Sequence, residues 1–166
     1  MKIHIGSDHT GYEMKEFLKK ELALLDSEIV DHGANELNTD DDYPDFIRKV
    51  AEAVANDPEH SRGVVFGGSG QGEAMCANKI KGIRAGVYYG TDKTQTDIKG
   101  NTLDMVSSLR EHNDANVISL GARFITNEQA LEAVKIFLNT PFSNDERHIR
   151  RINKLETCLP DRQASH

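Results

Sequence analysis

Short apolar runs alternate along the chain with longer segments in which apolar residues recur every three or four positions. The runs predict five β-strands, because stretches this short and this apolar suit the buried strands of a sheet. These strands are expected at Lys2 to Ser7, Ser27 to Asp31, Arg62 to Phe66, Arg84 to Tyr88 and Val117 to Leu120.

The segments between the runs predict helices. In the first of them, Met14, Leu18, Leu22 and Leu25 form one apolar stripe, which is typical of a helix with one buried face. Between residues 90 and 111 only the second half has such a stripe. The expected helices are residues 12–25, 44–56, 71–80, the second half of 90–111, 126–138 and a last one beginning near 143.

Capping signals support three of these helix starts. Pro44 suits the opening turn of a helix, because its missing N–H would have no partner there. Thr126 and Gln129 have the spacing of a capping box, and Ser143 and Glu146 have it too. The helices are therefore expected to begin at these signals.

Strands that alternate with helices predict an α/β fold, a Rossmann-like three-layer αβα sandwich with a five-stranded, mostly parallel sheet. With 166 residues the chain fits one domain, residues 1–158, and residues 159–166 are expected to form a frayed tail. Ligands collect at the carboxyl ends of parallel strands. We therefore expect one rim to hold Asp8, His9, the turn Gly67 to Glu73, the segment after Val117 and also His112.

Composition narrows the possible functions. The net charge of -7 argues against nucleic-acid binding, which needs a basic face. No apolar run approaches the roughly 20 residues of a membrane helix, and the N-terminus turns polar too soon for a secretory signal, so we expect a cytoplasmic protein. Cys76 and Cys158 form no Cys-x-x-Cys pair, and the sequence has no His-Glu-x-x-His motif, so neither a disulfide scaffold nor a metal site is expected.

A glycine-rich turn joins the third predicted strand to the next helix. It reads Gly67-Gly68-Ser69-Gly70-Gln71-Gly72-Glu73. Glycines let a ligand approach the backbone, and the helix start leaves N–H groups unpaired. The phosphate-loop Lys-Ser/Thr pair is absent, so a nucleotide site is not indicated. Tight packing alone could explain one glycine, but four glycines with a serine and an acid favour a ligand site.

Glu73 allows two interpretations. An acid in a first helical turn commonly just complements the helix dipole. If the turn binds substrate, the carboxylate could instead take a proton from a carbon next to a carbonyl while N–H groups stabilise the oxyanion. The helix dipole lowers the pKa of such a carboxyl and burial raises it, and the sequence leaves open which effect is larger.

Basic and histidine-containing segments are the other candidates for chemistry. A single histidine at a helix–strand junction is more often structural than catalytic. Arg147 and Arg151 lie four positions apart and share a helix face that points away from the stripe of Ile149, Ile152 and Leu155. A solvated basic face is the simpler interpretation. If the stripe packs on its own sheet, however, the arginines point outward and could bind phosphate in a neighbouring subunit's site, which predicts a dimer with shared sites.

Several motifs in order resemble ribose-5-phosphate isomerase type B, in the family that also contains galactose-6-phosphate isomerase subunits. They are Gly-Ser-Asp-His-Thr-Gly-Tyr at 6–12, the turn at 67–73, Ala-Asn-Lys at 77–79, Gly-Ile-Arg-Ala at 82–85, Glu-His-Asn-Asp at 111–114 and the basic segment 147–151. The resemblance runs from Lys2 to about Leu155. It implies aldose–ketose isomerisation of a phosphorylated sugar without metal or cofactor. We expect a homodimer, and a tetramer stays open as the alternative.

The resemblance also implies roles for individual residues. Many members have a cysteine base at the position of Gly67, which this sequence lacks. A second branch has glycine there and uses a glutamate at the position of Glu73, so Glu73 would be the base and Cys76 would not. The oxyanion would be held by Ser69 and the N–H groups of Gly70, Gln71 and Gly72.

The remaining roles concern the sugar and its phosphate. By the same resemblance, Asp8 and His112 would assist ring opening, with Asn113 beside them. Tyr43 matches a pocket position. The phosphate would be bound by His9, Arg123, Arg147, His148 and Arg151, the last three from the partner subunit.

Ribose 5-phosphate is the expected substrate, and two alternatives stay open. One is isomerisation of another phosphorylated aldose, such as allose or galactose 6-phosphate. The other is a sugar-phosphate-binding protein without catalysis. The crossover from Gly90 to Glu111 is about ten residues longer than the family pattern, so the extra segment is either a surface insertion or a cover that changes which sugar fits.

Overall fold

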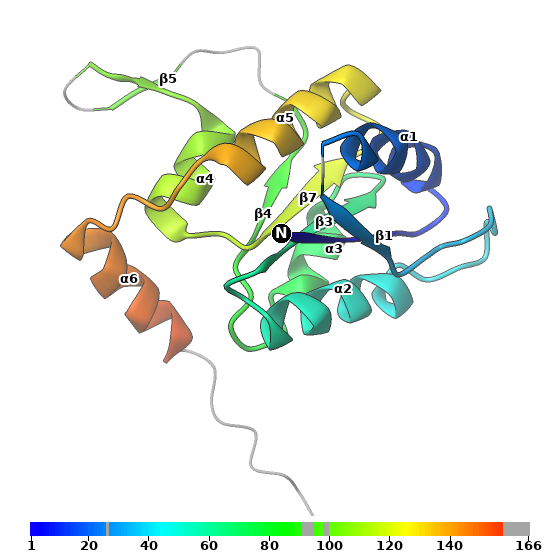
Figure 1. Ribbon diagram of the computed structural model, residues 1–166, viewed down its shortest axis with the longest axis horizontal. Coiled ribbons are helices and arrows are strands. Elements are labelled where there is room, and N and C mark those ends of the chain that lie inside the picture. The colour runs from blue at the N-terminus through cyan, green and yellow to red at the C-terminus, as the bar shows by residue number, and fades with distance from the viewer. Residues whose placement is uncertain (26, 91–94, 98–99, 158–166) are drawn as a thin grey trace, which may run out of the picture.

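A five-stranded parallel sheet forms the centre of the molecule (Figure 1). The computed structural model describes residues 1–25, 27–90, 95–97 and 100–157. The strands lie in the order β2-β1-β3-β7-β4. Their bounds are β1 Lys2–Ser7, β2 Glu28–Asp31, β3 Ser61–Gly67, β4 Ala85–Tyr88 and β7 Val117–Gly121. The predicted strands and the predicted α/β fold are confirmed.

Helices cover both faces of the sheet (Figure 1). On one face lie α1 Tyr12–Ala23, α4 Met105–Asn113 and α5 Asn127–Asn139, whose buried side chains share a core with Val64 and Phe66 of β3. On the other face, α2 Pro44–Asn56 and α3 Gln71–Ala77 pack against Val65 of the same strand. Successive residues of a strand point to opposite faces, so one apolar strand serves both cores.

One of the two predicted capping boxes is present. Thr126 caps α5, with its hydroxyl and the Gln129 side chain bonded reciprocally to backbone N–H groups. The Ser143 prediction is wrong, because α6 Glu146–Glu156 begins after Asp145. The hydroxyl of Ser143 instead lies 2.7 Å from Nδ1 of His148. Ser143, three positions before the first residue of α6, thus holds the buried ring of His148 in place.

The long crossover contains a small hairpin that the sequence did not predict. Its strands are β5 Gln95–Thr96 and β6 Thr102–Leu103, which pair antiparallel apart from the main sheet. The helix expected in the second half is present as α4, capped by the Asp104 carboxylate, which accepts from the Ser107 N–H. In Figure 1 the hairpin extends away from the sheet beyond α4.

Helix α6 projects from the body of the molecule (Figure 1). Ile149 and Leu155 of its apolar stripe are 40% and 54% exposed. We predicted outward-facing arginines on the condition that this stripe packs on the helix's own sheet. The stripe is exposed, so that condition is not met.

The predicted tail, residues 159–166, lies outside the described residues, and the single domain 1–158 stays a prediction. Among the described residues, no helix combines the length and the apolar character needed to cross a bilayer.

A buried lysine ties α1 to strand β2. The Lys15 side chain is fully buried, and its Nζ donates to Asp31 at 2.8 Å and to Glu16 at 2.7 Å. Asp31 also accepts from Lys19 at 2.6 Å and from the N–H of Gly33. Burial works to raise the pKa of Asp31, but these donors outweigh it and lower that pKa. The buried Lys15 ammonium thus has two carboxylate partners, and Asp31 has two ammonium partners.

We expect Asp31→Asn to lower the free energy of unfolding by about 3 kcal/mol, because it leaves the buried Lys15 ammonium with Glu16 alone. Urea unfolding at neutral pH measures this change. Glu28→Gln, which removes an exposed carboxylate from the same strand, is the matched control and should change stability by less than about 0.5 kcal/mol. Equal effects of the two variants would contradict the proposed importance of the Lys15–Asp31 pair.

Candidate active site

The glycine turn packs against the carboxyl end of strand β7. Gly70 caps α3 with φ +76°, a conformation that glycine adopts without strain. A Cβ on Gly70 would lie 3.1 Å from the Leu120 carbonyl carbon, and the Ser119 hydroxyl donates to the Gly70 carbonyl at 2.7 Å. The Ser69 hydroxyl accepts from the N–H of Gln71. The turn is therefore held at the carboxyl edge of the sheet, where the sequence placed it.

The carboxyl group of Glu73 occupies the place of a side chain at position 67. Gly67 ends strand β3, and a Cβ built on it would overlap both the Oε1 and Cδ atoms of Glu73. Glu73 is only 5% exposed. The glycine and the glutamate therefore form one spatial unit: the acid reaches from the helix into the space that the glycine leaves free.

Burial raises the pKa of the Glu73 carboxyl above its ordinary value. The N–H of Glu73 itself lowers it in part, and the negative charge of Asp8 raises it further. Burial is the largest of these contributions, and the net shift of the Glu73 pKa is upward. A carboxylate with a raised pKa is a better proton acceptor than an exposed one.

Two more of the predicted site residues lie beside this unit. Asp8, which is 7% exposed, accepts at Oδ1 from the hydroxyl of Thr10 and from two backbone N–H groups. Tyr43 precedes α2, and a Cβ on Gly72 would lie 3.0 Å from its hydroxyl oxygen. Tyr43 thus packs over the start of α3, so Gly72 is the residue that leaves room for it.

Two basic side chains, those of Arg123 and His9, lie beside the turn. The Arg123 guanidinium lies next to Gly68, whose added Cβ would meet its Nη1 at 3.3 Å. The ring of His9 is bonded through Nδ1 to Oδ1 of Asp41 at 2.6 Å. That hydrogen bond is the main cause of a raised pKa of His9, and the positive charge of Arg123 opposes it. His9 and Arg123 together can hold an anion.

Asp8, His9 and Asp41 could also offer ligand atoms to a metal ion. Among the described residues, one atom from each of these three lies within 4.8 Å of the others. The sequence had indicated no such cluster, because Asp41 lies 32 residues from His9. The hydrogen bond between His9 and Asp41 already accounts for the proximity of two of the three groups.

The other predicted site residues form a second group at the opposite edge of the sheet. His112 and Asn113 end helix α4, just before the amino end of β7, so the expectation that His112 shares a rim with Asp8 is wrong. Its ring lies 4.6 Å from that of His148. Burial, and after it the charge of His112, lower the pKa of His148. Arg147 and Arg151 are exposed on the same helix as His148.

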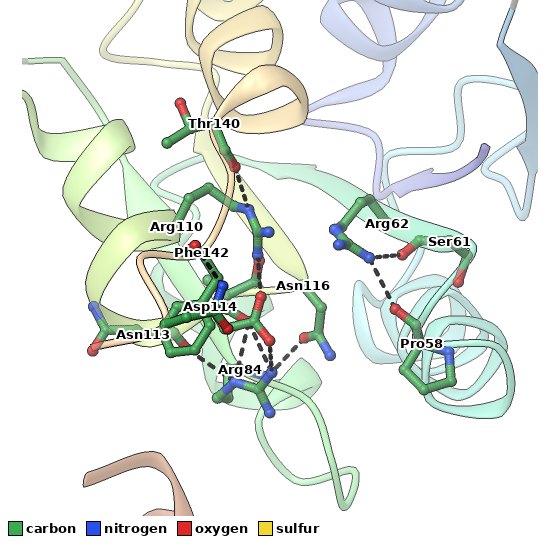
Figure 2. Close-up of polar contacts among 12 residues, drawn as sticks. Pro58, Ser61, Arg62, Arg84, Arg110, Asn113, Asp114, Asn116, Thr140 and Phe142 are labelled. Atoms are coloured by element: carbon green, nitrogen blue, oxygen red, sulfur yellow. Dashed lines mark hydrogen bonds and ion pairs between the residues drawn. The ribbon is translucent and has the colours of Figure 1, made fainter. Parts of the chain in front are cut away.

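A network of polar groups around the buried Arg110 fixes the end of α4 (Figure 2). Asp114 ends the helix in the left-handed region with φ 43°, and its carboxylate bonds to Arg110 at 2.9 Å and to Arg84 at 3.0 Å. Arg84 also donates to the carbonyl groups of Asn113 and Asp114 and pairs with Glu156 of α6. Figure 2 shows Arg84 and Arg110 on either side of Asp114. This network was not predicted from the sequence, although Arg84 lies in the Gly-Ile-Arg-Ala motif at 82–85.

The chain matches the ribose/galactose isomerase family over residues 3–155. A curated relative, ribose-5-phosphate isomerase B of Mycobacterium tuberculosis, is 37% identical over 155 residues, which cover 93% of this chain and 88% of the relative. The probable ribose-5-phosphate isomerase B of Mycoplasma genitalium is 35% identical over 153 residues, 92% of each chain.

Solved structures give the same result. The crystal structure of ribose-5-phosphate isomerase B from Mycoplasma genitalium with bound ribulose-5-phosphate is similar with a TM-score of 0.84 at 33% identity, covering 95% of each chain. Ribose-5-phosphate isomerase B of Clostridium thermocellum has a TM-score of 0.82 at 39% identity, covering 95% of this chain and 97% of the other. The fold similarity therefore extends over almost the whole chain.

We expect the Glu73 carboxyl to titrate above the ordinary glutamate pKa, and Asp8→Asn to lower that pKa without abolishing the shift, because burial is its largest cause. The ¹³C chemical shift of Glu73 Cδ as a function of pH measures it, with Glu73→Gln assigning the signal. A pKa at or below about 4.3 in the wild type would contradict the described burial of the carboxyl group.

Proposed function

The chain belongs to the ribose/galactose isomerase family, and from this premise we propose that it interconverts ribose 5-phosphate and ribulose 5-phosphate, with Glu73 as the base. The observation that carries the assignment of the base is the Glu73 carboxyl group in the space beside Gly67. By the family resemblance, that space belongs to a cysteine base in many members. A base that reaches the same space from the helix can act on the same carbon atoms.

The proposed reaction moves one carbon-bound proton. Glu73 takes the proton from C2 of the open-chain aldose, and the electrons form an enediolate whose charge lies on the C1 oxygen. The proton then returns to C1, while the proton of the C2 hydroxyl passes to the C1 oxygen. The C2 oxygen is left as the carbonyl of the ketose, so atoms and charges balance without metal or redox chemistry.

The glycine turn would stabilise the enediolate. The Ser69 hydroxyl and the N–H groups of Gly70, Gln71 and Gly72 lie at the start of α3, where the first N–H groups of a helix lack partners within the helix. N–H groups held in place before the reaction stabilise developing negative charge without reorganisation. Asp8 and Tyr43, which lie beside the turn, would orient the sugar, with Asp8 assisting ring opening.

The substrate's phosphate would bind to His9 and Arg123. Arg123 lies next to Gly68 of the turn, and an arginine can give a phosphate two parallel hydrogen bonds. The positive charge of Arg123 acts on His9, so the two side chains form one cationic group beside the turn. Such a group favours a phosphorylated aldose over an uncharged sugar.

A second subunit would complete the site. His112 and Asn113 lie at the sheet edge opposite Glu73, and the ring of His148 on α6 packs against that of His112. This placement supports the proposal that these three residues, with Arg147 and Arg151, serve the Glu73 of another chain. Exposed apolar side chains near the turn support such an interface: Met75 is 66% exposed, Tyr89 46% and Phe124 64%. We therefore keep the proposal of a homodimer with shared sites. A cytoplasmic location also stays a prediction.

Replacement of the base tests the proposed function most simply. We expect Glu73→Gln to lower kcat for ribose 5-phosphate at least about 1,000-fold and to leave substrate binding within about threefold, since the amide keeps the volume but cannot accept the proton. Exchange of the C2 proton with solvent deuterium, followed by NMR, should stop in the variant. Binding is measured by calorimetry.

Three results would contradict parts of this assignment. Turnover near the wild-type value in Glu73→Gln would remove Glu73 as the base. Binding of the sugar without proton exchange in the wild type would make the chain a binding protein. Faster turnover of allose or galactose 6-phosphate than of ribose 5-phosphate, in a panel on the pure protein, would change the substrate but not the reaction.

Mixed dimers test whether two chains share each site. Glu73→Gln and Arg147→Ala should each be impaired alone, because one lacks the base and the other a phosphate ligand. Co-expressed, they should recover about a quarter of wild-type turnover, because half of randomly paired dimers are mixed and each has one intact site of two. No recovery in a mixture shown to contain mixed dimers would mean that Glu73 and Arg147 do not serve the same site across subunits.

A further inference from the structure

We propose that Asp41 is a positioning residue that fixes the His9 ring through Nδ1 and leaves its Nε2–H for the substrate's phosphate. The inference rests on the proposed function for the identity of the anion. It concerns a residue in the polar segment before α2, 32 positions from His9, which neither the motifs nor the family resemblance had singled out.

Two hydrogen bonds join Asp41 to His9. Oδ1 of Asp41 accepts from the backbone N–H of His9 at 3.0 Å and is bonded to its ring Nδ1 at 2.6 Å. Oδ1 of Asp41 thus fixes both the backbone at His9 and the orientation of the His9 ring. Because Nδ1 faces the carboxylate, it carries a proton, and Nε2 is the ring nitrogen left to face a ligand.

The burial of Asp41 favours a charged His9 ring. The Asp41 side chain is 8% exposed, whereas that of His9 is 27% exposed. Oδ2 of Asp41 is buried and has no hydrogen-bond partner among the described residues. A buried carboxylate with so few donors needs a nearby positive charge, and the imidazolium of His9 is in direct contact with it. The 2.6 Å separation is typical of a charge-assisted hydrogen bond.

Other groups around His9 act in both directions. The hydrogen bond to Asp41 is the largest cause that raises the pKa of His9, and the negative charge of Asp8 adds to it. Burial and the positive charge of Arg123 lower that pKa, but the net shift is upward. Without Asp41, only the charge of Asp8 would oppose burial and the cation Arg123. The Asp41–His9 pair therefore helps to keep His9 positively charged although Arg123 is also positive.

This arrangement has a consequence for pH dependence. A raised pKa means that His9 keeps its proton above pH 6.5, the ordinary midpoint of histidine, and loses it only as the pH passes the higher folded-state value. Affinity for a phosphate should fall over that range. Without the Asp41 charge the loss should begin at lower pH, so the effect of removing Asp41 should be large at neutral pH and small at acidic pH.

Asp41→Asn tests the role, with Asp40→Asn as the matched control. Asp40 is the exposed neighbour of Asp41, so the control removes the same charge from the same segment. NMR titration of His9 and the KM and kcat for ribose 5-phosphate would be measured between about pH 5.5 and 8.5 for each protein. Binding of inorganic phosphate, followed through the His9 signals, gives a readout that needs no turnover.

We expect Asp41→Asn to lower the His9 pKa and to raise KM about tenfold near pH 7.5, the effect of losing one charge-assisted contact, with kcat within about twofold. Near about pH 5.5, the KM of the variant should approach that of the wild type. Asp40→Asn should match the wild type throughout. Asp41→Glu, which restores a carboxylate one methylene away, should recover part of the shift in the His9 pKa.

Several results would overturn the inference. A His9 pKa at or below its ordinary value in the wild type would overturn it. This result does not depend on whether any variant folds. A KM increase in Asp41→Asn that is equal at every pH would mean that Asp41 only holds the loop. If the wild type lacks isomerase activity, the proposed function fails. The His9 titration and its response to inorganic phosphate still decide the role of Asp41.

Discussion

The absence of a side chain at Gly67 is the constraint on which the site depends. Strand β3 ends there, and the carboxyl group of Glu73 fills the space where a Cβ would lie. Helix α3 must therefore start close to the strand end, which requires the left-handed turn at Gly70 and its contact with β7. The same closeness buries the carboxyl group and raises its pKa. The missing side chain at Gly67 thus explains both where the Glu73 carboxyl group packs and why its pKa is raised.

The parallel sheet separates the remaining functional groups. All its strands run in one direction, so the turn after β3 and the end of α4 before β7 lie at opposite edges. Glu73 and the glycine turn, with its proposed oxyanion donors, belong to one edge, and the paired histidines with the α6 arginines belong to the other. A protein with net charge -7 carries those arginines on a helix that projects from its body. Association of two chains would bring these halves together.

The sequence predicted what depends on local pattern. Apolar runs located all five strands of the main sheet, and the Thr126 capping box is present, because both signals lie within a few residues. The sequence-based prediction failed where contacts between residues far apart in the chain determine the structure. The hydroxyl of Ser143 turns to His148 instead of capping a helix, α6 projects from the body, and the hairpin of the long crossover has no strong pattern. The Asp41–His9 pair joins residues 32 apart, so spacing gave no signal for it.

The most direct test of the account is the turnover of Gly67→Ala. The three atoms nearest to the added methyl group all belong to the flexible end of the Glu73 side chain, so the protein should fold with near-normal thermal stability while the carboxyl group is displaced. The account predicts that kcat for ribose 5-phosphate falls at least about 100-fold with substrate binding retained. Wild-type turnover in a folded Gly67→Ala protein would contradict it, because the position of the Glu73 carboxyl group would then not matter for the reaction.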